Sequence, residues 1–545
     1  MTTLDSPACP TSAPAVPRVR HWIAAAAWPG AVFLLALLPR LAGLADRPLW
    51  LDEVFTWQRA SLKPAALVLD SFQNHHMPSF FLLISPLTGL GHPELWLRLP
   101  SAIFGALAVM LVFMIAYRIA GRLAGVLAAL VMGLSPTALA FSQEARSYTL
   151  EMCLILVALY GVVRLALDLR AAGREMLAPG ARAGWLCFIG GTVAAVDTLG
   201  DGLPWLLAAN LAFFCLLFFA PAPRALAINV VKADLIAALC AAPFYALMTH
   251  FQSSSAVNSV MWIPPLNLSR FWYSLGSVYF MHVADWVTFH FMKVPTPDIL
   301  LWLIDAVLMA ALAAATWRLR HRPAMLAVLG ISLIFLPGLF ALISLWRPIF
   351  LPRYLLWSAA PFAVLAGIGA AALLDHVAPR ARRVAVVLTA VLLLVNTLPY
   401  YGAETKPRWD IAARMLAQEV APGDVVYLTD LGALPVLRLY LPPGAQTVVL
   451  NDADGDLAHA YSALSQGHRV WTVCGHAGQS VDRVDVGQFF ATNQALGTPS
   501  QVQKAGKRIT IALYSPASPA PVANTQPAAP PAPVCAPGAA HGGCS

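Results

Sequence analysis

The stretch LPSAIFGALAVMLVFMIAY, residues 99–117, decides the fold class of this chain. It carries no charged side chain from end to end. As a helix it would extend about 28 Å, which matches the hydrocarbon thickness of a bilayer. Stretches of similar length and apolar character recur along the chain, at 22–41, 123–141, 148–167, 184–200, 203–220, 225–248, 298–317, 324–346, 354–374 and 384–401.

Composition agrees with this pattern. The chain has 545 residues, of which 59% are hydrophobic and 11% charged, and its mean hydropathy is +0.68. A soluble protein cannot bury that much apolar surface, so the sequence predicts a polytopic α-helical membrane protein with about 11 spans, or 12–13 if further stretches cross. The net charge of +8 does not indicate nucleic-acid binding, because the arginines stand in short connections between apolar segments.

These connections predict the orientation. Cytoplasmic connections are enriched in Lys and Arg, which places the N-terminus inside and the C-terminus outside. The basic connections fall on the cytoplasmic side throughout only if residues 42–98 form an outer first loop. In that loop PSFFLLISPLTGL (78–90) is a re-entrant or surface-lying helix; a full crossing there is the alternative. The basic groups that alternate are Arg18 and Arg20, Arg118 and Arg122, Arg164 to Arg182, Arg224 and Lys232, Arg318 to Arg322, and Arg380 to Arg383.

The domain organisation follows from composition. Residues 1–21 are expected to be a disordered cytoplasmic segment, followed by a transmembrane catalytic domain over 22–402. Segment 22–41 is longer than a signal-peptide core, which favours an uncleaved anchor over a cleaved signal peptide. From 403 to 515, strand-like runs such as DVVYLTD and RVWTVCG alternate with helix-like runs, which predicts a small α/β domain on the outer side. The Pro- and Ala-rich tail, 516–545, is expected to be disordered.

The remaining ionisable residues gather on the predicted outer side. Charges level with the bilayer surface usually line a polar cavity or pair with one another, although surface loops are polar in any protein. Acids and arginines on one face predict a basin for an anionic substrate with a lipid tail. The set comprises Asp52, Glu53, His75, His76, Glu94, Arg98, Glu144, Arg146, Asp197, Asp201, Asp285, Arg347 and Arg353.

Within this set, RPLWLDEVFTW (47–57) places Asp52 and Glu53 in an apolar, interfacial setting. A carboxylate there can accept a hydroxyl proton as a general base, and partial burial would raise its pKa into a useful range. The alternative is a structural role at a helix N-terminus, where acids satisfy free N–H groups. Asp52 is the first candidate for the base and Glu53 the second.

Four further motifs stand at the ends of predicted spans. NHHMPSFFLL places His75 and His76 before an apolar helix, but adjacent helical positions point in different directions. LRLPSAIFGAL carries Arg98 at its second position, while SQEARSYTLEM and LPRYLLW carry further candidates. Arg353 stands on the outer side against the positive-inside trend, and its guanidinium fork suits a phosphate. Interfacial anchoring is the alternative for Arg146 and Tyr148.

Together, these motifs resemble the bacterial dolichyl-phosphate-mannose-protein mannosyltransferase-like enzymes, which are C-type (GT-C) membrane glycosyltransferases. LWLDEVFT, NHHMPSFFLL, LRLPSAIFGAL, SPTALAFSQEARSYTLEM and LPRYLLWSAAPFAVL occur in the family's order over residues 22–401. The group includes aminoarabinose transferases acting on lipid A and galacturonosyl transferases of the lipopolysaccharide core. The motifs are specific for the superfamily and say little about the substrate.

The resemblance implies roles for individual positions. The family's first-loop acid pair falls on Asp52 and Glu53, with Asp52 as catalytic base or metal-associated carboxylate. Its second acidic motif falls on Glu144, and its phosphate-linked Arg-Tyr pair on Arg353 and Tyr354. Substrate-binding roles are expected for His75, His76, Arg98, Glu144, Arg146, Tyr148, Arg353 and Tyr354. The family's HPPLYY reads HHMPSFF here, which puts the acceptor pocket in doubt.

The implied function is transfer of a sugar from a polyprenyl-phosphate-linked donor to an acceptor in the cell envelope. That acceptor is lipid A or core lipopolysaccharide, a polysaccharide or a protein, reached from the periplasmic side of the bacterial inner membrane. No nucleotide-binding glycine loop is evident in the sequence. Divalent-metal dependence occurs in the superfamily, but the sequence assigns no ligands. The alternatives are a lipid or glycan transporter (flippase), which would place coupling acids near mid-membrane, and a non-catalytic scaffold.

Overall fold

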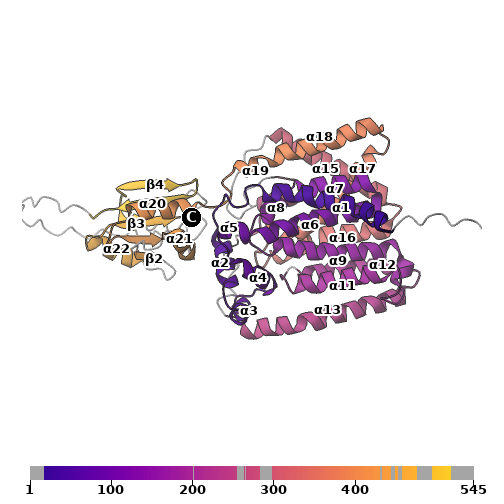
Figure 1. Ribbon diagram of the computed structural model, residues 1–545, viewed down its shortest axis with the longest axis horizontal. Helices are drawn as coiled ribbons and strands as arrows, with labels where there is room; N and C mark the ends of the chain where they lie inside the picture. The colour runs from indigo at the N-terminus through magenta and orange to yellow at the C-terminus, as the bar shows by residue number, and fades with distance from the viewer. Residues whose placement is uncertain are drawn as a thin grey trace, which may run out of the picture.

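The computed structural model describes residues 18–200, 202–253, 263, 265–282, 298–429, 433–442, 448–451, 457–475 and 494–516. A bundle of long helices forms one part of the molecule and a small sheet with its helices forms the other (Figure 1). The short helices α2 to α5 lie at the end of the bundle that faces the sheet (Figure 1). The predicted fold class is confirmed, with apolar spans followed by a small C-terminal sheet region.

The bundle helices coincide with the apolar stretches of the sequence. Within the described residues, seven helices are long and apolar enough to cross a membrane, one further pair, α7 with α8, is bent by 65°, and three apolar helices are shorter. The chain is therefore a multi-pass membrane protein. The helices are α1 (Arg18–Leu41), α6 (Leu99–Ala120), α7 (Arg122–Gly133), α8 (Pro136–Ser142), α9 (Tyr148–Leu167), α11 (Arg182–Val196), α12 (Gly202–Leu217), α13 (Pro223–Phe251), α15 (Asp298–Leu319), α16 (Pro323–Ile343), α17 (Ala359–Leu374) and α18 (Pro379–Thr397).

Helix α17 is the centre of the bundle, because 89% of its apolar window is buried inside the protein. Two glycines allow neighbouring backbones to approach it closely. A Cβ atom at Gly369 would lie 1.7 Å from the carbonyl oxygen of Ala311 in α15, and one at Gly367 would lie 2.5 Å from that of Ala124 in α7. Small residues at such contacts are typical of membrane helix packing, where close van der Waals contact replaces the hydrophobic effect.

Several short helices connect the spans. The stretch 78–90, for which a full crossing was the alternative, contains only the six-residue α4 and one 3-10 turn. Six helical residues extend about 9 Å, which is too short to cross a bilayer. Helix α1 begins at Arg18, inside the segment expected to be disordered. The short helices are α2 (Leu51–Ala60), α3 (Pro64–Gln73), α4 (Ser79–Ile84), η1 (Ser85–Leu87), α5 (Pro93–Trp96), α10 (Leu169–Ala172), α14 (Leu268–Tyr279), η3 (Pro352–Ser358) and α19 (Pro399–Gly402).

The C-terminal sheet has five strands in the order β2-β1-β3-β5-β4. Strands β1, β2 and β3 run parallel, while β5 and the edge strand β4 are antiparallel. Strand β4 was not predicted, because QVQKA is polar and largely exposed and therefore shows no alternating apolar pattern. The elements are α20 (Trp409–Glu419), β1 (Val425–Leu428), α21 (Leu434–Tyr440), β2 (Val448–Asn451), α22 (Leu457–Ser465), β3 (Val470–Cys474), β4 (Gln501–Ala505) and β5 (Ile509–Tyr514).

The sheet region packs directly on the first loop. One hydrophobic cluster contains Val54 of α2 together with Trp409 of α20 and Val436 of α21. The Tyr440 hydroxyl accepts a hydrogen bond of 2.6 Å from the Leu49 N–H and donates one of 2.8 Å to Glu94. The first loop is therefore held between the bundle and the C-terminal region.

Candidate active site at one end of the spans

The adjacent acids Asp52 and Glu53 lie in the first turn of α2, but their side chains have different surroundings. Asp52 keeps 24% of its side chain exposed, whereas Glu53 is fully buried. Successive residues of a helix point about 100° apart, so one carboxylate can face the solvent side while its neighbour faces the core. The alternative role predicted from the sequence was that an acid satisfies free N–H groups at a helix N-terminus. Glu53 has this role, because it accepts a hydrogen bond from the Trp50 N–H at 3.3 Å.

Glu53 belongs to a buried ion pair with Arg98, which is only 1% exposed. Both Glu53 oxygens accept from the Arg98 guanidinium at 2.7 Å, and Oε1 also accepts from the Ala145 N–H at 2.9 Å. The other Arg98 donors bind the carbonyl oxygens of Leu44, Arg47 and Pro48. Since all five N–H groups of a guanidinium are thus occupied, Arg98 has no donor left for a substrate.

Burial by itself would raise the pKa of Glu53, but the charges of Arg98 and Lys406 together hold that pKa at about 2. Glu53 is therefore ionised throughout the physiological pH range. A carboxylate locked as an anion by two cations is a poor proton acceptor. The structure thus favours a structural role for Glu53 and leaves Asp52 as the better candidate for a base.

Lys406 is the most important residue at the site that the sequence reasoning did not select. It follows α19 and is 3% exposed, with its ammonium 2.9 Å from Glu53 Oε2 and 3.7 Å from Glu144 Oε1. A signal was available in the sequence, because Lys406 is a basic residue in a segment expected outside, against the positive-inside trend. The same signal did select Arg353.

Glu144 lies in the turn between α8 and α9 and is 2% exposed. Burial raises its pKa to about 7; nearby Lys406 opposes this, while the carboxylates of Glu53 and Asp52 add to it. A buried carboxyl with this pKa gains or loses its proton near neutral pH. Tyr400 of α19 is also close enough for the Glu144 charge to act on its hydroxyl.

Asp52 forms an ion pair with Arg353 of η3, across 301 residues of sequence, at 3.2 Å. Arg353 is 8% exposed, and its guanidinium carbon lies 5.1 Å from the Tyr354 ring centroid and 6.0 Å from that of Tyr148. Arg146 joins this group, because its Nη1 lies 3.4 Å from the Asp52 carbonyl oxygen and 3.3 Å from the Thr56 hydroxyl. The structure therefore brings together five of the residues expected at the site.

Arg146 and Arg353 give this group an excess of positive charge. In the described part of the chain, no carboxylate lies within 4.0 Å of the Arg146 guanidinium, and Asp52 pairs with Arg353. The Glu53 carboxylate does not offset the positive charge of Arg146 and Arg353, because it is already paired with Arg98 and Lys406. Two guanidiniums around one carboxylate, flanked by aromatic faces, form an environment that favours an added anion.

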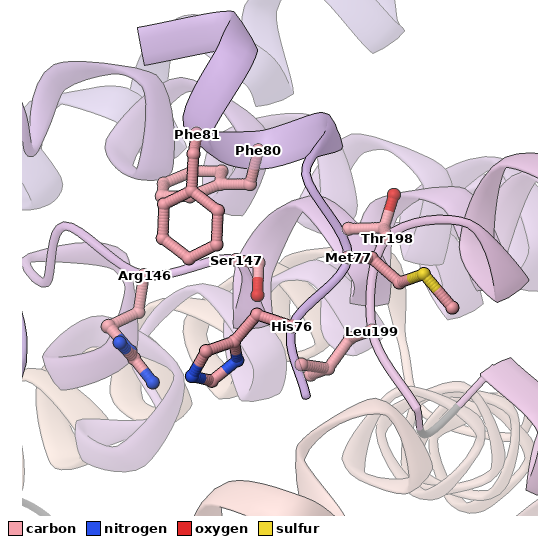
Figure 2. Close-up of a pocket in the computed structure, with 8 residues that line it drawn as sticks. All are labelled: His76, Met77, Phe80, Phe81, Arg146, Ser147, Thr198 and Leu199. Carbon is pink, nitrogen blue, oxygen red and sulfur yellow. The ribbon is translucent and has the colours of Figure 1, made fainter. Parts of the chain in front are cut away.

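His76 lies beside this group in a small pocket (Figure 2). Figure 2 shows its ring on the same side of the pocket as the Arg146 guanidinium, with Met77 and Leu199 beyond it. Burial, reinforced by the charges of Arg146 and Arg59, holds the pKa of His76 well below its usual value, so the imidazole is neutral. The cavity measures about 10 Å³, which is room for one water molecule rather than a sugar ring.

Other residues expected at the site have different surroundings. His75 is exposed and has a left-handed backbone conformation (φ 56°), and Arg347 is exposed on the segment before η3. Glu94 accepts from Tyr440 of the C-terminal region, and the backbone carbonyl of Asp197 accepts from Ser79 at 2.5 Å. The positions Asp201 and Asp285 fall outside the described residues.

The described residues do not fit a protein-bound metal ion. No group of three or more His, Cys, Asp or Glu side chains among them is placed to hold one. The two acids of α2 are instead engaged by cations, Asp52 by Arg353 and Glu53 by Arg98 and Lys406.

No protein-family model matches the chain, and no curated protein matches it either. Solved structures do match. ArnT from Cupriavidus metallidurans in the apo state has a TM-score of 0.54 at 17% identity, covering 90% of this chain and 98% of that one. The same protein bound to undecaprenyl phosphate scores 0.52 at 16% identity, again covering 90% and 98%.

A second similar protein is the archaeal oligosaccharyltransferase AglB from Archaeoglobus fulgidus, in complex with an inhibitory peptide and a dolichol-phosphate. Its TM-score is 0.51 at 14% identity, with 82% of this chain and 69% of that chain covered. Identities this low show a common fold. The chain has the fold that ArnT and AglB share.

Proposed function

We propose that this protein is a glycosyltransferase that takes a sugar from a polyprenyl-phosphate-linked donor and transfers it to a cell-envelope acceptor. The reaction would occur at the periplasmic face of the bacterial inner membrane. The observation that carries the proposal is the grouping of one partly exposed acid, Asp52, with Arg353 and Arg146 at one end of the spans. Structures of ArnT with undecaprenyl phosphate and of AglB with a dolichol-phosphate, which have the same fold, support a lipid phosphate as donor.

The roles follow from charge and position. An acceptor hydroxyl attacks the anomeric carbon while the bond from that carbon to the phosphate oxygen breaks, and the polyprenyl phosphate leaves with the electron pair. Asp52 takes the hydroxyl proton as general base. Arg353 and Arg146 stabilise the negative charge that develops on the leaving phosphate, as preorganised cations do in many active sites. If the acceptor is itself a phosphate, no base is needed and Asp52 would position Arg353 instead.

Aromatic side chains and a neutral histidine surround the proposed phosphate-binding arginines. The rings of Tyr148 and Tyr354 lie beside the Arg353 guanidinium and limit the water around it. The neutral His76 can donate or accept a hydrogen bond but adds no charge. Because the cavity beside it has room for one water molecule, a sugar requires movement of the lining side chains.

Replacement of Arg353 by Gln is expected to weaken the binding of undecaprenyl phosphate. A hydrogen bond to a charged group contributes about 1.5–3 kcal/mol, so the dissociation constant should rise about ten- to hundredfold. Titration of the purified protein in nanodiscs, followed by tryptophan fluorescence or native mass spectrometry, measures this. The matched control is Arg438→Gln, which alters an exposed arginine of α21. Equal affinity in the two variants would remove Arg353 from the phosphate site.

The function itself is tested by deleting the gene and analysing the envelope by mass spectrometry. A sugar lost from lipid A, core oligosaccharide, polysaccharide or glycoprotein, and restored by the wild-type chain, would identify both the sugar and the acceptor. An unchanged set of glycans together with a glycolipid accumulating at one membrane face would instead support a transporter.

A further inference from the structure

The segment between the last span and the sheet region supplies a buried cation to the site. Lys406 lies between α19 and α20, in neither a span nor a strand, and only 3% of its side chain is exposed. Its ammonium lies between two carboxylates, 2.9 Å from Glu53 Oε2 and 3.7 Å from Glu144 Oε1, and 5.6 Å from the Trp50 ring centroid. A desolvated lysine is costly unless it is paired, so this placement is a specific feature of the fold.

Each carboxylate that Lys406 contacts is close in sequence to a group of the proposed reaction. Glu53 directly follows Asp52 on α2, and Glu144 stands two residues before Arg146 in the turn between α8 and α9. The Ala145 N–H, in the same turn, donates to Glu53 at 2.9 Å. Lys406 therefore lies where three separate segments of the chain meet: α2, the turn, and its own connecting segment.

We propose, on the basis of the proposed function, that Lys406 is a positioning residue: by bridging Glu53 and Glu144 it fixes Asp52 of α2 relative to Arg146 of the turn. Lys406 does not contact the substrate in this proposal. Its effect on the reaction comes from the geometry of the base and the phosphate-binding cations. Misplacement of reacting groups by about 1 Å can lower a rate about a hundredfold, so such a bridge has a measurable consequence.

The bridge also depends on pH. The charged or titratable groups that act on Glu144 are Lys406, Glu53 and Asp52 from α2, Arg353 from η3 and Tyr400 from α19. Burial places the pKa of Glu144 at about 7, and Lys406 lowers it from a still higher value. Above that pKa Glu144 is ionised and the bridge is complete; below it Glu144 holds a proton and loses its ion pair with Lys406. Removing the lysine charge should therefore raise the pKa of Glu144 further.

The test compares Lys406→Gln with wild-type full-length protein in nanodiscs. Lys406→Gln should lower kcat about ten- to hundredfold, leave the KM for the lipid-linked donor nearly unchanged, and move the acidic limb of the pH profile to higher pH. Lys406→Arg, which keeps the charge, should recover most of the activity. The matched control is Lys504→Gln, which removes an exposed lysine from β4 and should leave activity and pH profile unchanged.

A second readout needs no substrate. The infrared band of protonated Glu144, identified by its loss in Glu144→Gln, should titrate near pH 7 in the wild-type protein and at higher pH in Lys406→Gln. If wild-type protein transfers no sugar but the band shifts, the proposed function fails and the bridge stands. An unshifted band, or a Lys406→Gln variant with wild-type kcat and pH profile, overturns the proposal. If Lys406→Gln does not fold, Glu144→Gln must show the same loss of kcat, since it breaks the same bridge; full activity in that variant also overturns it.

Discussion

Replacement of Asp52 by Asn is expected to lower the rate of sugar transfer about 10²–10⁴-fold, the usual contribution of a positioned general base. Asn keeps the shape of the side chain but cannot take a proton at neutral pH. Because Asp52 is partly exposed and its side chain forms one ion pair, with Arg353, the fold should persist. Size-exclusion chromatography and a thermal melt of the purified variant check that persistence before activity is compared.

The same substitution should separate the chemical step from donor binding. Removing the Asp52 carboxylate leaves Arg353 without this partner, so its guanidinium becomes more available to a phosphate. We therefore expect kcat to fall while the affinity for undecaprenyl phosphate stays the same or rises, the opposite of the result for Arg353→Gln. Asp46→Asn, which changes an exposed acid of the same loop, is the control. A folded Asp52→Asn protein with wild-type kcat would exclude the base assignment.

Replacement of Arg98 by Met is expected to destabilise the protein more than any substitution around Asp52. Removing one partner of a buried ion pair leaves the other charge uncompensated, which costs about 3–5 kcal/mol. Here the substitution also strands the three carbonyl oxygens that Arg98 contacts in the first loop. The midpoint of thermal unfolding in detergent, measured beside wild type, should fall clearly.

Two comparisons make this prediction specific. Arg118→Met alters an exposed arginine of α6, the helix that Arg98 immediately precedes, and should change the midpoint little. In a double-mutant cycle with Glu53→Gln, the two losses should be far from additive, because each variant already breaks the same pair. Additive losses, or an Arg98→Met midpoint equal to wild type, would show that the pair does not hold the loop. Weakened donor binding with unchanged stability would instead indicate that Arg98 binds the substrate.

Part of the site could be expected from the sequence. Asp52 and Arg353 were selected because an acid and an arginine stood at predicted outer span ends, and the structure pairs them at 3.2 Å. Arg98 and Glu53 were selected as well, but their mutual pairing was not foreseen, since 45 residues separate them. Lys406 was missed although it is a basic residue on the predicted outer side, because it stands alone at the start of a region predicted to be a separate α/β domain.

What the sequence by itself determined is the set of spans and the fold class. In a bilayer every segment must satisfy its own backbone and match the hydrocarbon with apolar side chains, so spanning is a local property that hydropathy records. What only the tertiary structure decided is which charges neutralise one another. Asp52 and Glu53 are neighbours in one helical turn, yet Arg98 and Lys406 lock Glu53 as a buried anion while Asp52 remains partly exposed beside Arg353. Ion pairing depends on distances and burial between remote segments, and no local pattern encodes them.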